Sequence, residues 1–301
     1  MIGEIKNALV ARLPPAQKQR LKARVGLAQK AWINRFRSYG PDDLESRLGR
    51  MGLGAGDIVL IHSSFRSTNG FRASPRDVTE AVRRIVGPDG TIAMMSMPYT
   101  TSTKEHLATG AVFDVRRTPS AMGIITEIFR RSGALRSLSP THPILAVGPR
   151  AEELLAGHAD CPYPCGPDSP FEHMLELDAK VLFFDLPFVA FTFFHYIEHR
   201  LRDRLPFPLY DEKPVIARYV DYDGTPRSAE VYVFGQEAIE RRRVDVLARA
   251  SRRSGTSVWS RLGNTQLVLT RMSAVLDEAL RLAERGTLPY DVSGGARAAE
   301  R

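Results

Sequence analysis

The chain has 301 residues, of which 43% are hydrophobic, and its formal net charge is +8. This length and composition are typical of a soluble globular protein with one large domain or two small ones. No apolar run reaches the roughly 18 residues of a membrane span, and the first residues lack the apolar core of a signal peptide. The two cysteines, Cys161 and Cys165, argue against a disulfide framework, so we expect a cytoplasmic protein.

Residues 1–45 are predicted to form a basic helical extension, because cationic and apolar side chains alternate between residues 18 and 37. We expect one face of this helix to pack on its own domain or on a neighbouring subunit in a homo-oligomer. Peripheral contact with the anionic inner face of a membrane, or with an acidic partner, is the alternative. Nucleic acid is not an expected partner, since no reading motif or aromatic platform accompanies the charge.

From Gly56 onward the sequence alternates predicted strands and helices. Strands are predicted at 57–62, 91–95, 144–147 and 181–184, and helices begin near 75, 118, 151, 170 and 192. A β-hairpin at 215–222 and 229–234, a helix at 238–250, a strand at 266–270 and a helix at 274–285 follow. The pattern predicts an α/β fold, a layered α/β/α sandwich around a mostly parallel central sheet. We expect a single domain over residues 46–288 and a loose tail over 289–301.

The loop 136–143, with the sequence RSLSPTHP, is a candidate catalytic segment. It lies between a predicted helix and a predicted strand, and two prolines restrict its backbone. Loops held by a rigid scaffold often carry catalytic groups, and this loop contains Ser139 and His142. On these residues alone, a structural role for His142 is equally compatible with the sequence.

Four stretches resemble the aminoglycoside 3-N-acetyltransferase family. They are GDIVLIHSS at 56–64, VGPDGT at 86–91, the segment 136–149, and a final block made of GPDSP at 166–170, VLFF at 181–184 and HYIE at 195–198. The resemblance covers about half of the chain. It implies transfer of acetyl from acetyl-CoA to an amine, commonly on a sugar-like ring, by direct attack in a ternary complex.

The chemistry implied by this family requires a base, because an ammonium group must lose a proton before it attacks a thioester. In the family the base is the histidine of an Arg-Ser-x-His-Pro pattern, but here Ser139 precedes Pro140 and the imidazole belongs to His142. Three interpretations stay open. His142 acts as the base after a shift of the loop, which is preferred because an imidazole remains beside the expected site. His195 or His62 is the base, supported by Glu198. Or amine acetylation has been lost.

His195 and Glu198 are three residues apart on a predicted helix and therefore lie on the same face of it. A carboxylate beside an imidazole orients it and stabilises its charged form, so both residues are catalytic candidates. Ser139 is a candidate nucleophile only if an imidazole lies within hydrogen-bond reach.

The resemblance also implies residues for the coenzyme arm. His62, Ser63 and Ser64 follow a predicted strand at the edge where open α/β sheets bind ligands, and Arg66 is a candidate phosphate partner. Thr118, Met122 and Gly123 are predicted to open a helix whose free N–H groups could face a pyrophosphate. No metal is expected, because the spacing of Cys161 and Cys165 with His158 and His173 matches no familiar zinc site.

Asp185 and Tyr99 are the candidate residues for the acceptor. Because polycationic antibiotics require many carboxylates, a chain with a charge of +8 is not an obvious host for them. A singly amino-substituted sugar in surface-polysaccharide biosynthesis is therefore favoured over antibiotic resistance. The rival hypotheses are a catalytically silent CoA- or sugar-binding homologue that acts through a partner, and transfer to a hydroxyl or of a longer acyl chain.

Overall fold

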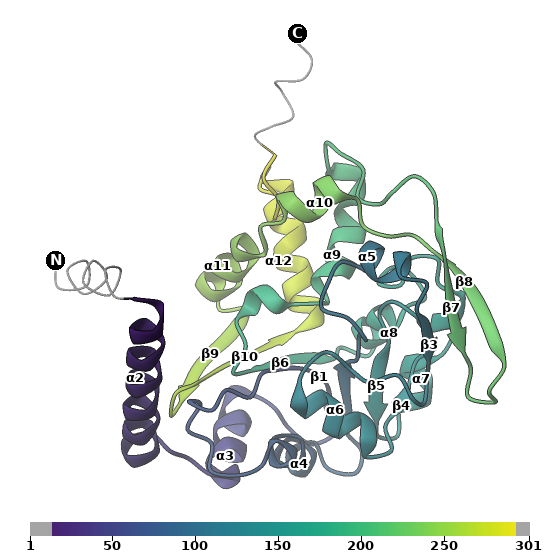
Figure 1. Ribbon diagram of the computed structural model, residues 1–301. Coiled ribbons are helices and arrows are strands. Elements are labelled where there is room, and N and C mark those ends of the chain that lie inside the picture. Colours follow the sequence, from purple (N-terminus) through teal and green to yellow (C-terminus); the bar gives the residue numbers. More distant parts are fainter. Residues whose placement is uncertain (1–13, 293–301) are drawn as a thin grey trace.

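The computed structural model describes residues 14–292, and a seven-stranded sheet forms its centre (Figure 1). The strand order is β4-β5-β2-β1-β6-β10-β9. The strands are β1 (Ile58–Ser63), β2 (Thr91–Met95), β4 (Leu135–Arg136), β5 (Ile144–Val147), β6 (Lys180–Phe184), β9 (Ser257–Leu262) and β10 (Thr265–Arg271). The predicted strands 91–95 and 144–147 have the bounds that the sequence indicates.

The sheet is mixed, and only its centre has the parallel arrangement that the sequence predicts. β1 pairs in parallel with β2 and β6, whereas β5 is antiparallel to β2 and β10 is antiparallel to β6. The outer pairs β4–β5 and β9–β10 are also antiparallel. A two-residue turn at Gly263 and Asn264 joins β9 to β10, and a turn this short can only connect antiparallel strands.

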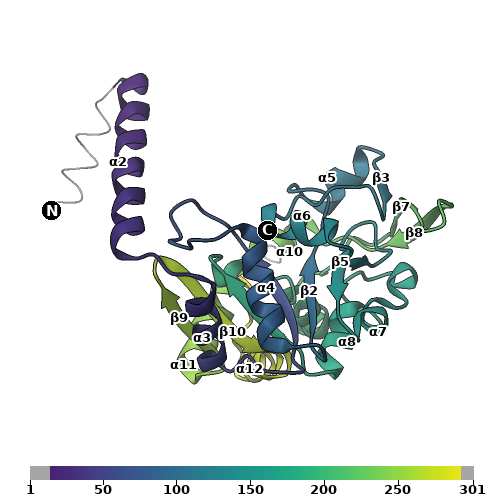
Figure 2. The same cartoon turned by 90° about the horizontal axis from the view of Figure 1, so that it is seen from below.

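Helices lie on both faces of the sheet (Figures 1 and 2). Alternate residues of one strand separate the two cores: Val59 and Ile61 belong to one hydrophobic cluster and Leu60 to the other. The first cluster contains α3 (Pro41–Met51), α4 (Pro75–Val86) and α6 (Ile124–Arg131). The second contains α7 (Ala151–Leu155), α8 (Pro170–Glu176), α9 (Phe194–Leu201), α11 (Val244–Ser254) and α12 (Met272–Glu284).

A small second sheet flanks the main one, with the order β3-β7-β8. It contains β3 (Val112–Asp114), β7 (Val215–Val220) and β8 (Pro226–Val231), and β7 and β8 form the predicted hairpin. Tyr222 in the hairpin turn accepts a hydrogen bond from the Arg136 amide and donates one to its carbonyl. The hairpin is thereby fixed to the start of the loop 136–143.

The helix predicted at 238–250 is two helices, α10 (Gln236–Arg241) and α11. The break falls at Arg242, whose backbone leaves the helical region and pairs with Tyr290. Tyr290 is buried, and the carbonyl of Pro289 accepts a hydrogen bond from the Arg243 amide. The expectation of a loose tail from residue 289 is therefore wrong for 289–291, while 293–301 lie outside the described residues.

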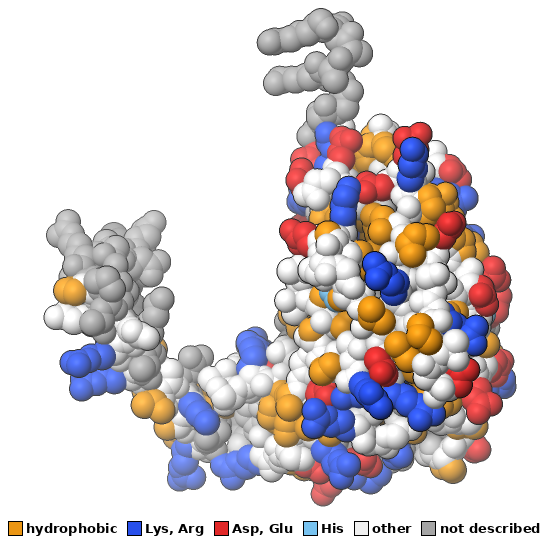
Figure 3. Space-filling model, turned by 45° about the vertical axis from the view of Figure 1, so that its right-hand side comes forward, with side chains coloured by type: hydrophobic (Ala, Val, Ile, Leu, Met, Phe, Trp, Pro, Cys, Tyr) orange, Lys and Arg blue, Asp and Glu red, His pale blue; other side chains and the backbone are white. Residues whose placement is uncertain are grey.

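The helix α2 (Pro15–Phe36) stands apart from the body of the molecule in both ribbon views. Ile33 is buried near its C-terminal end, but Val25, Trp32 and Phe36 are half-exposed or more. Figure 3 shows Lys and Arg side chains gathered along this helix. No helix between residues 14 and 292 is long and apolar enough to cross a membrane.

The sequence boundary at residue 45 falls inside α3, whose Leu44 and Leu48 are fully buried in the first core cluster. Part of the predicted extension is thus packed into the domain. The remaining short helices are α5 (Thr103–Ala108) and the 3-10 helices η1 (His158–Asp160), η2 (Phe188–Ala190) and η3 (Arg202–Arg204).

Candidate active site

A pocket of about 310 Å³ lies at the carboxyl edge of the central parallel strands. Tyr99 follows the end of β2, and His195 lies on the helix that follows β6. His142 comes just before β5, and because β5 runs antiparallel to β2 its beginning lies at the same edge. The lining residues are Met97, Tyr99, Thr101, Ser102, Thr103, Lys104, His142, His195, Val233, Phe234, Gln236, Ile239 and Arg242.

Glu198 is fully buried and receives three hydrogen bonds. Its Oε2 is 2.7 Å from His195 Nδ1, and its Oε1 is 2.5 Å from Arg242 Nε and also accepts from the Tyr290 hydroxyl. Since a carboxylate can only accept, His195 carries its proton on Nδ1. The other ring nitrogen, Nε2, is then the one with a free lone pair.

Burial and the neighbouring charges set the pKa values of this cluster. Burial would raise the pKa of Glu198, but the hydrogen bond from His195 and the charge of Arg242 hold it below its ordinary value. Burial lowers the pKa of His195, and Glu198 partly offsets this shift. The pair therefore combines an ionised carboxylate with an imidazole that is neutral near pH 7, the state that a general base requires.

His142 faces the same pocket, with its ring 5.9 Å from that of His195 in an edge-on arrangement. Its Nδ1 is 3.1 Å from the Thr141 hydroxyl. Burial is the main reason that its pKa lies well below the usual value, and the charges of His195, His158 and Arg242 lower it further. Glu198 lies against His195, so a proton is better stabilised on that imidazole than on His142.

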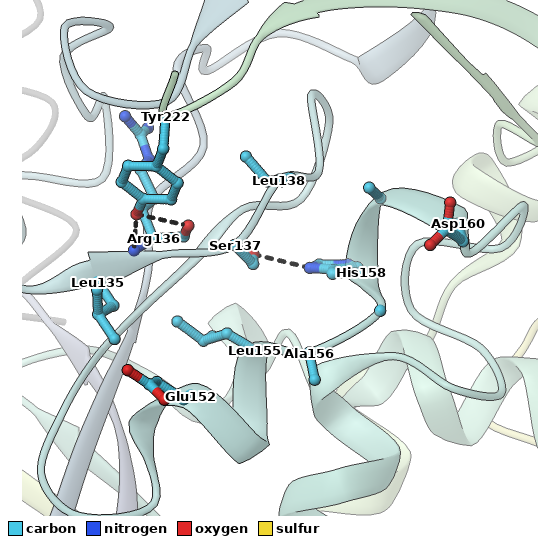
Figure 4. Close-up of a pocket in the computed structure, with 12 residues that line it drawn as sticks. Leu135, Arg136, Ser137, Leu138, Glu152, Leu155, Ala156, His158, Asp160 and Tyr222 are labelled. Atoms are coloured by element: carbon cyan, nitrogen blue, oxygen red, sulfur yellow. Dashed lines mark hydrogen bonds between the residues drawn. The ribbon is translucent and has the colours of Figure 1, made fainter. Parts of the chain in front are cut away.

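Among residues 14–292, no imidazole forms a hydrogen bond with the Ser139 hydroxyl, so the partner that a nucleophile would need is absent there. Its hydroxyl accepts the backbone N–H of His142 at 3.2 Å, which closes the turn between the two residues. The serine that meets an imidazole is Ser137, whose Oγ is 2.7 Å from His158 Nδ1 (Figure 4). His158 Nε2 donates to the Pro164 carbonyl at 2.8 Å, so the ring joins the loop 136–143 to the segment after η1.

The structure pairs Arg66 and Asp185 with each other. The buried carboxylate of Asp185 accepts hydrogen bonds from the Arg66 amide, Nε and Nη2. Neither residue lines the pocket described above. The two residues join the turn after β1 to the end of β6, and Asp185 does so with a positive φ of 57°.

His62 is buried near the end of β1 and does not line the pocket; its Nε2 lies 3.3 Å from the Thr192 hydroxyl and its ring packs on Phe183 and Phe191. Burial, followed by the charge of His195, lowers its pKa to about 3. Next to it, the buried Ser63 hydroxyl has no hydrogen-bond partner among residues 14–292. Ser64 donates its amide to the Phe184 carbonyl.

The segment 118–123 precedes a helix but does not open it as predicted, because α6 begins at Ile124 with Gly123 as its N-cap. The Thr118 carbonyl accepts a hydrogen bond from the buried guanidinium of Arg136 at 2.6 Å. The Met122 amide donates to the Ser120 hydroxyl. The amides of Thr118, Ser120 and Ala121 also donate within the protein, so in this segment the amide of Gly123 and the first amides of α6 are left as candidates for an anion.

Tyr99 contributes a ring to the pocket wall, but its hydroxyl donates to the Thr141 carbonyl at 2.7 Å. Within the described part of the chain, no group of three His, Cys, Asp or Glu side chains could hold a metal ion. Cys161 and Cys165 are both buried and free, and burial raises the pKa of each thiol.

Residues 60–284 match the model of the aminoglycoside 3-N-acetyltransferase family, which is more than half of the chain. The chain belongs to this family. Aminoglycoside N(3)-acetyltransferase IV from Salmonella sp is 30% identical over 188 residues, which cover 60% of this chain and 69% of that protein. Aminoglycoside N(3)-acetyltransferase VIII from Streptomyces fradiae is 31% identical over 173 residues, which cover 52% of this chain and 58% of that protein.

Solved structures of the family share the mixed α/β fold. Aminoglycoside acetyltransferase AAC(3)-Xa superposes with a TM-score of 0.71 at 20% identity, over 88% of this chain and 99% of the other. AAC-IIIb, in a binary complex with CoASH, has a TM-score of 0.69 at 22% identity, over 83% and 98%. A mutant of AAC(3)-IVa, in a complex with a gentamicin, has a TM-score of 0.68 at 24% identity, over 82% and 89%. The family assignment makes this chain an acyltransferase, as the sequence predicts.

Sequence reasoning missed two members of the cluster around Glu198, namely Arg242 and Tyr290. They lie 44 and 92 residues from Glu198 along the chain. Arg242 is one of three consecutive arginines, and nothing in that run distinguishes the one that turns inward. Tyr290 lies in a segment without periodic hydrophobicity, so the sequence offers no signal for its burial.

Proposed function

We propose that this protein transfers the acetyl group of acetyl-CoA to the amine of an amino sugar or a related acceptor. The observation that carries the proposal is the hydrogen bond of 2.7 Å between His195 and Glu198 beside a pocket large enough for a small molecule. The family relation supports the acyl transfer, and the relative that is named as a CoASH complex supports the coenzyme.

In this mechanism His195 is the general base. Its Nε2 takes a proton from the acceptor ammonium, and the free amine attacks the thioester carbonyl as CoA leaves as a thiol. Glu198 fixes the tautomer of His195 and stabilises the imidazolium that forms. The acceptor is held against this nitrogen by the pocket wall, which makes the attack effectively intramolecular.

His142 is proposed as the neighbouring imidazole that orients the acceptor amine. It is neutral at pH 7, since burial depresses its pKa, and it contacts the same pocket as His195. A neutral imidazole with a free nitrogen can accept a hydrogen bond from the amine before the proton moves. We therefore assign the role of general base to His195, which has the carboxylate partner, and not to His142.

For the coenzyme we propose the turn after β1 and the start of α6. The Ser63 hydroxyl is buried without a partner among the described residues, and Ser64 is half-buried beside it. Gly123, as the N-cap of α6, exposes amide groups at the helix start. Arg66 is half-exposed even while it pairs with Asp185, so it still offers positive charge to a phosphate.

The test is release of free thiol from acetyl-CoA by the purified 301-residue chain, with a panel of amino sugars, nucleotide-linked amino sugars and aminoglycosides. Turnover that needs both an amine acceptor and His195 is expected. If no amine releases CoA while CoA still raises the melting temperature, the protein binds the coenzyme without this activity and the proposal fails.

A further inference from the structure

The charged side chains that line the active-site pocket are cations. Among its lining residues, all of which the structure describes, Lys104 and Arg242 are charged at neutral pH, and no Asp or Glu side chain is among them. The lining also includes the apolar side chains of Val233, Phe234 and Ile239. An aminoglycoside carries several ammonium groups, and desolvating them against such a wall without carboxylates is unfavourable.

Arg242 has donor groups that its protein partners do not use. Its Nε donates to Glu198, and its guanidinium lies 4.5 Å above the ring of Phe234. Nη2 is enclosed by protein and the guanidinium lies beside the Tyr290 hydroxyl, whereas the side chain as a whole is 19% exposed and lines the pocket. The guanidinium therefore keeps N–H groups at the pocket wall that can donate to an acceptor oxygen of a ligand.

The chemistry of a guanidinium narrows the choice of ligand. Its planar fork of N–H groups matches the paired oxygens of a carboxylate or a phosphate. The stacking on Phe234 and the bond to Glu198 hold this fork in place, so little side-chain entropy is lost on binding.

Lys104 adds a second cation at the rim of the pocket. It lies on α5, its side chain is 64% exposed, and its Nζ is 2.7 Å from Asp211. An exposed ion pair of this kind contributes little to stability, and the lysine can turn to another anion at small cost. Asp211 itself is not part of the pocket lining.

Resting on the proposed function, we propose that the acceptor is an amino sugar that also carries a phosphate or carboxylate group, which Arg242 binds while the amine faces His195. Both side chains contact Glu198, so an anion at Arg242 and an amine at His195 lie close enough together to belong to one small molecule. The cavity of about 310 Å³ is at the small end of ligand pockets, which run from about 300 to 1,000 Å³. A single sugar ring with one substituent suits this space better than a multi-ring antibiotic.

The experiment compares kcat/KM with acetyl-CoA for five acceptors: glucosamine, glucosamine 6-phosphate, UDP-glucosamine, 2-amino-2-deoxyglucuronic acid and gentamicin. At least one anionic acceptor is expected to exceed neutral glucosamine by about 10-fold or more, the gain of one charge-assisted hydrogen bond, and gentamicin should be the poorest. Comparison of the phosphate-bearing acceptors with the carboxylate-bearing acceptor identifies which anion is preferred.

The variants Arg242→Met and Arg242→Lys show whether Arg242 binds the anionic group of the acceptor. Arg242 also contacts Glu198, so its loss lowers turnover of every acceptor; the decisive readout is the ratio of kcat/KM between anionic and neutral acceptors. This ratio should fall about 10-fold or more in Arg242→Met and be partly kept in Arg242→Lys. Lys104→Met should reduce it less. Arg150→Met is the control, because Arg150 follows β5 and lies at the opposite edge of the sheet.

A second measurement separates this inference from the proposed activity. Thermal stabilisation by glucosamine 6-phosphate, by 2-amino-2-deoxyglucuronic acid and by glucosamine is measured for the wild type and for Arg242→Lys and Lys104→Met. If no amine is acetylated but an anionic sugar stabilises the wild type and the variants weaken that effect, acetylation fails and this inference stands. The inference is overturned if the enzyme prefers gentamicin. It is also overturned if these variants change neither the ratio of kcat/KM between anionic and neutral acceptors nor the thermal stabilisation by the anionic sugars.

Discussion

Glu198→Gln is the substitution that tests the active site most directly, because it keeps the shape of the side chain and removes its charge. In the wild type, the two carboxylate oxygens receive three hydrogen bonds, from His195, Arg242 and Tyr290. Glutamine has a single acceptor oxygen. If that oxygen faces Arg242 and Tyr290, the amide N–H group faces His195 Nδ1, which must then lose its proton.

This exchange moves the His195 proton to Nε2, where the wild type has the lone pair that takes the acceptor's proton. The variant therefore lacks the base in its working tautomer. Since a positioned general base contributes about 10²- to 10⁴-fold to a rate, kcat/KM for the amine acceptor should fall by that factor, or about 3 to 5 kcal/mol of barrier.

The same substitution should destabilise the fold moderately. Breaking a buried ion pair costs about 3 to 5 kcal/mol. Arg242 is 19% exposed and keeps a hydrogen bond to the amide oxygen, so we expect a loss of about 1 to 3 kcal/mol. Thiol release from acetyl-CoA measures the first effect, and denaturant unfolding measures the second.

Glu172→Gln is the matched control for this experiment. Glu172 lies on α8, accepts a hydrogen bond from the Tyr196 hydroxyl at 2.7 Å and does not line the pocket. It should leave kcat/KM within a few-fold of the wild type. If a folded Glu198→Gln enzyme retains more than about a tenth of wild-type kcat/KM, Glu198 does not set the tautomer of a catalytic His195.

Three further predictions concern the base, the pH profile and the fold. His195→Ala should lower kcat by about 10²-fold or more, whereas His142→Ala should act mainly on KM; the opposite pattern in acetyl-CoA turnover would make His142 the base. Because burial depresses the pKa of His195, kcat/KM should rise with pH through a midpoint below 6.5. This midpoint should be lower in Glu198→Gln, because Glu198 raises the pKa of His195, and higher in Arg242→Met, because Arg242 lowers it. A wild-type midpoint above 6.5 would contradict this. Arg66→Met should lower the free energy of unfolding by about 1 to 3 kcal/mol, because the fully buried Asp185 carboxylate loses its partner. The control Arg84→Met removes an exposed pair with Glu45 and should lower it by under about 1 kcal/mol. Equal losses in denaturant unfolding would argue against a structural role for the pair of Arg66 and Asp185.

Local sequence signals were sufficient for much of the fold. The start of α4 illustrates this: Pro75 takes the first helical position, as the residue type predicts, and the Asp77 carboxylate accepts hydrogen bonds from the amide and the hydroxyl of Ser74, the N-cap residue. The continuous apolar runs at 91–95 and 144–147 predicted β2 and β5 with their bounds. These features depend on neighbours a few residues away, so the sequence contains all of the information.

Signals from the sequence were insufficient where the partner is distant. The antiparallel pairing of β5 with β2 and of β10 with β6 was not predicted, because a long stretch of chain separates the two strands of each pair. The mixed sheet was missed for the same kind of reason, because strand direction depends on how the chain returns across the sheet and not on the apolar pattern of each strand.

For the active site, the sequence by itself determined that His195 and Glu198 share a helical face, since a spacing of three residues fixes their relation. Only the tertiary structure decided what surrounds them. It brought His142 to the same pocket through the antiparallel pairing of β5 with β2, and it placed Arg242 and Tyr290 on Glu198 from 44 and 92 residues away. Contacts over such separations come from the packing of whole elements, and a local pattern of residues carries no record of them.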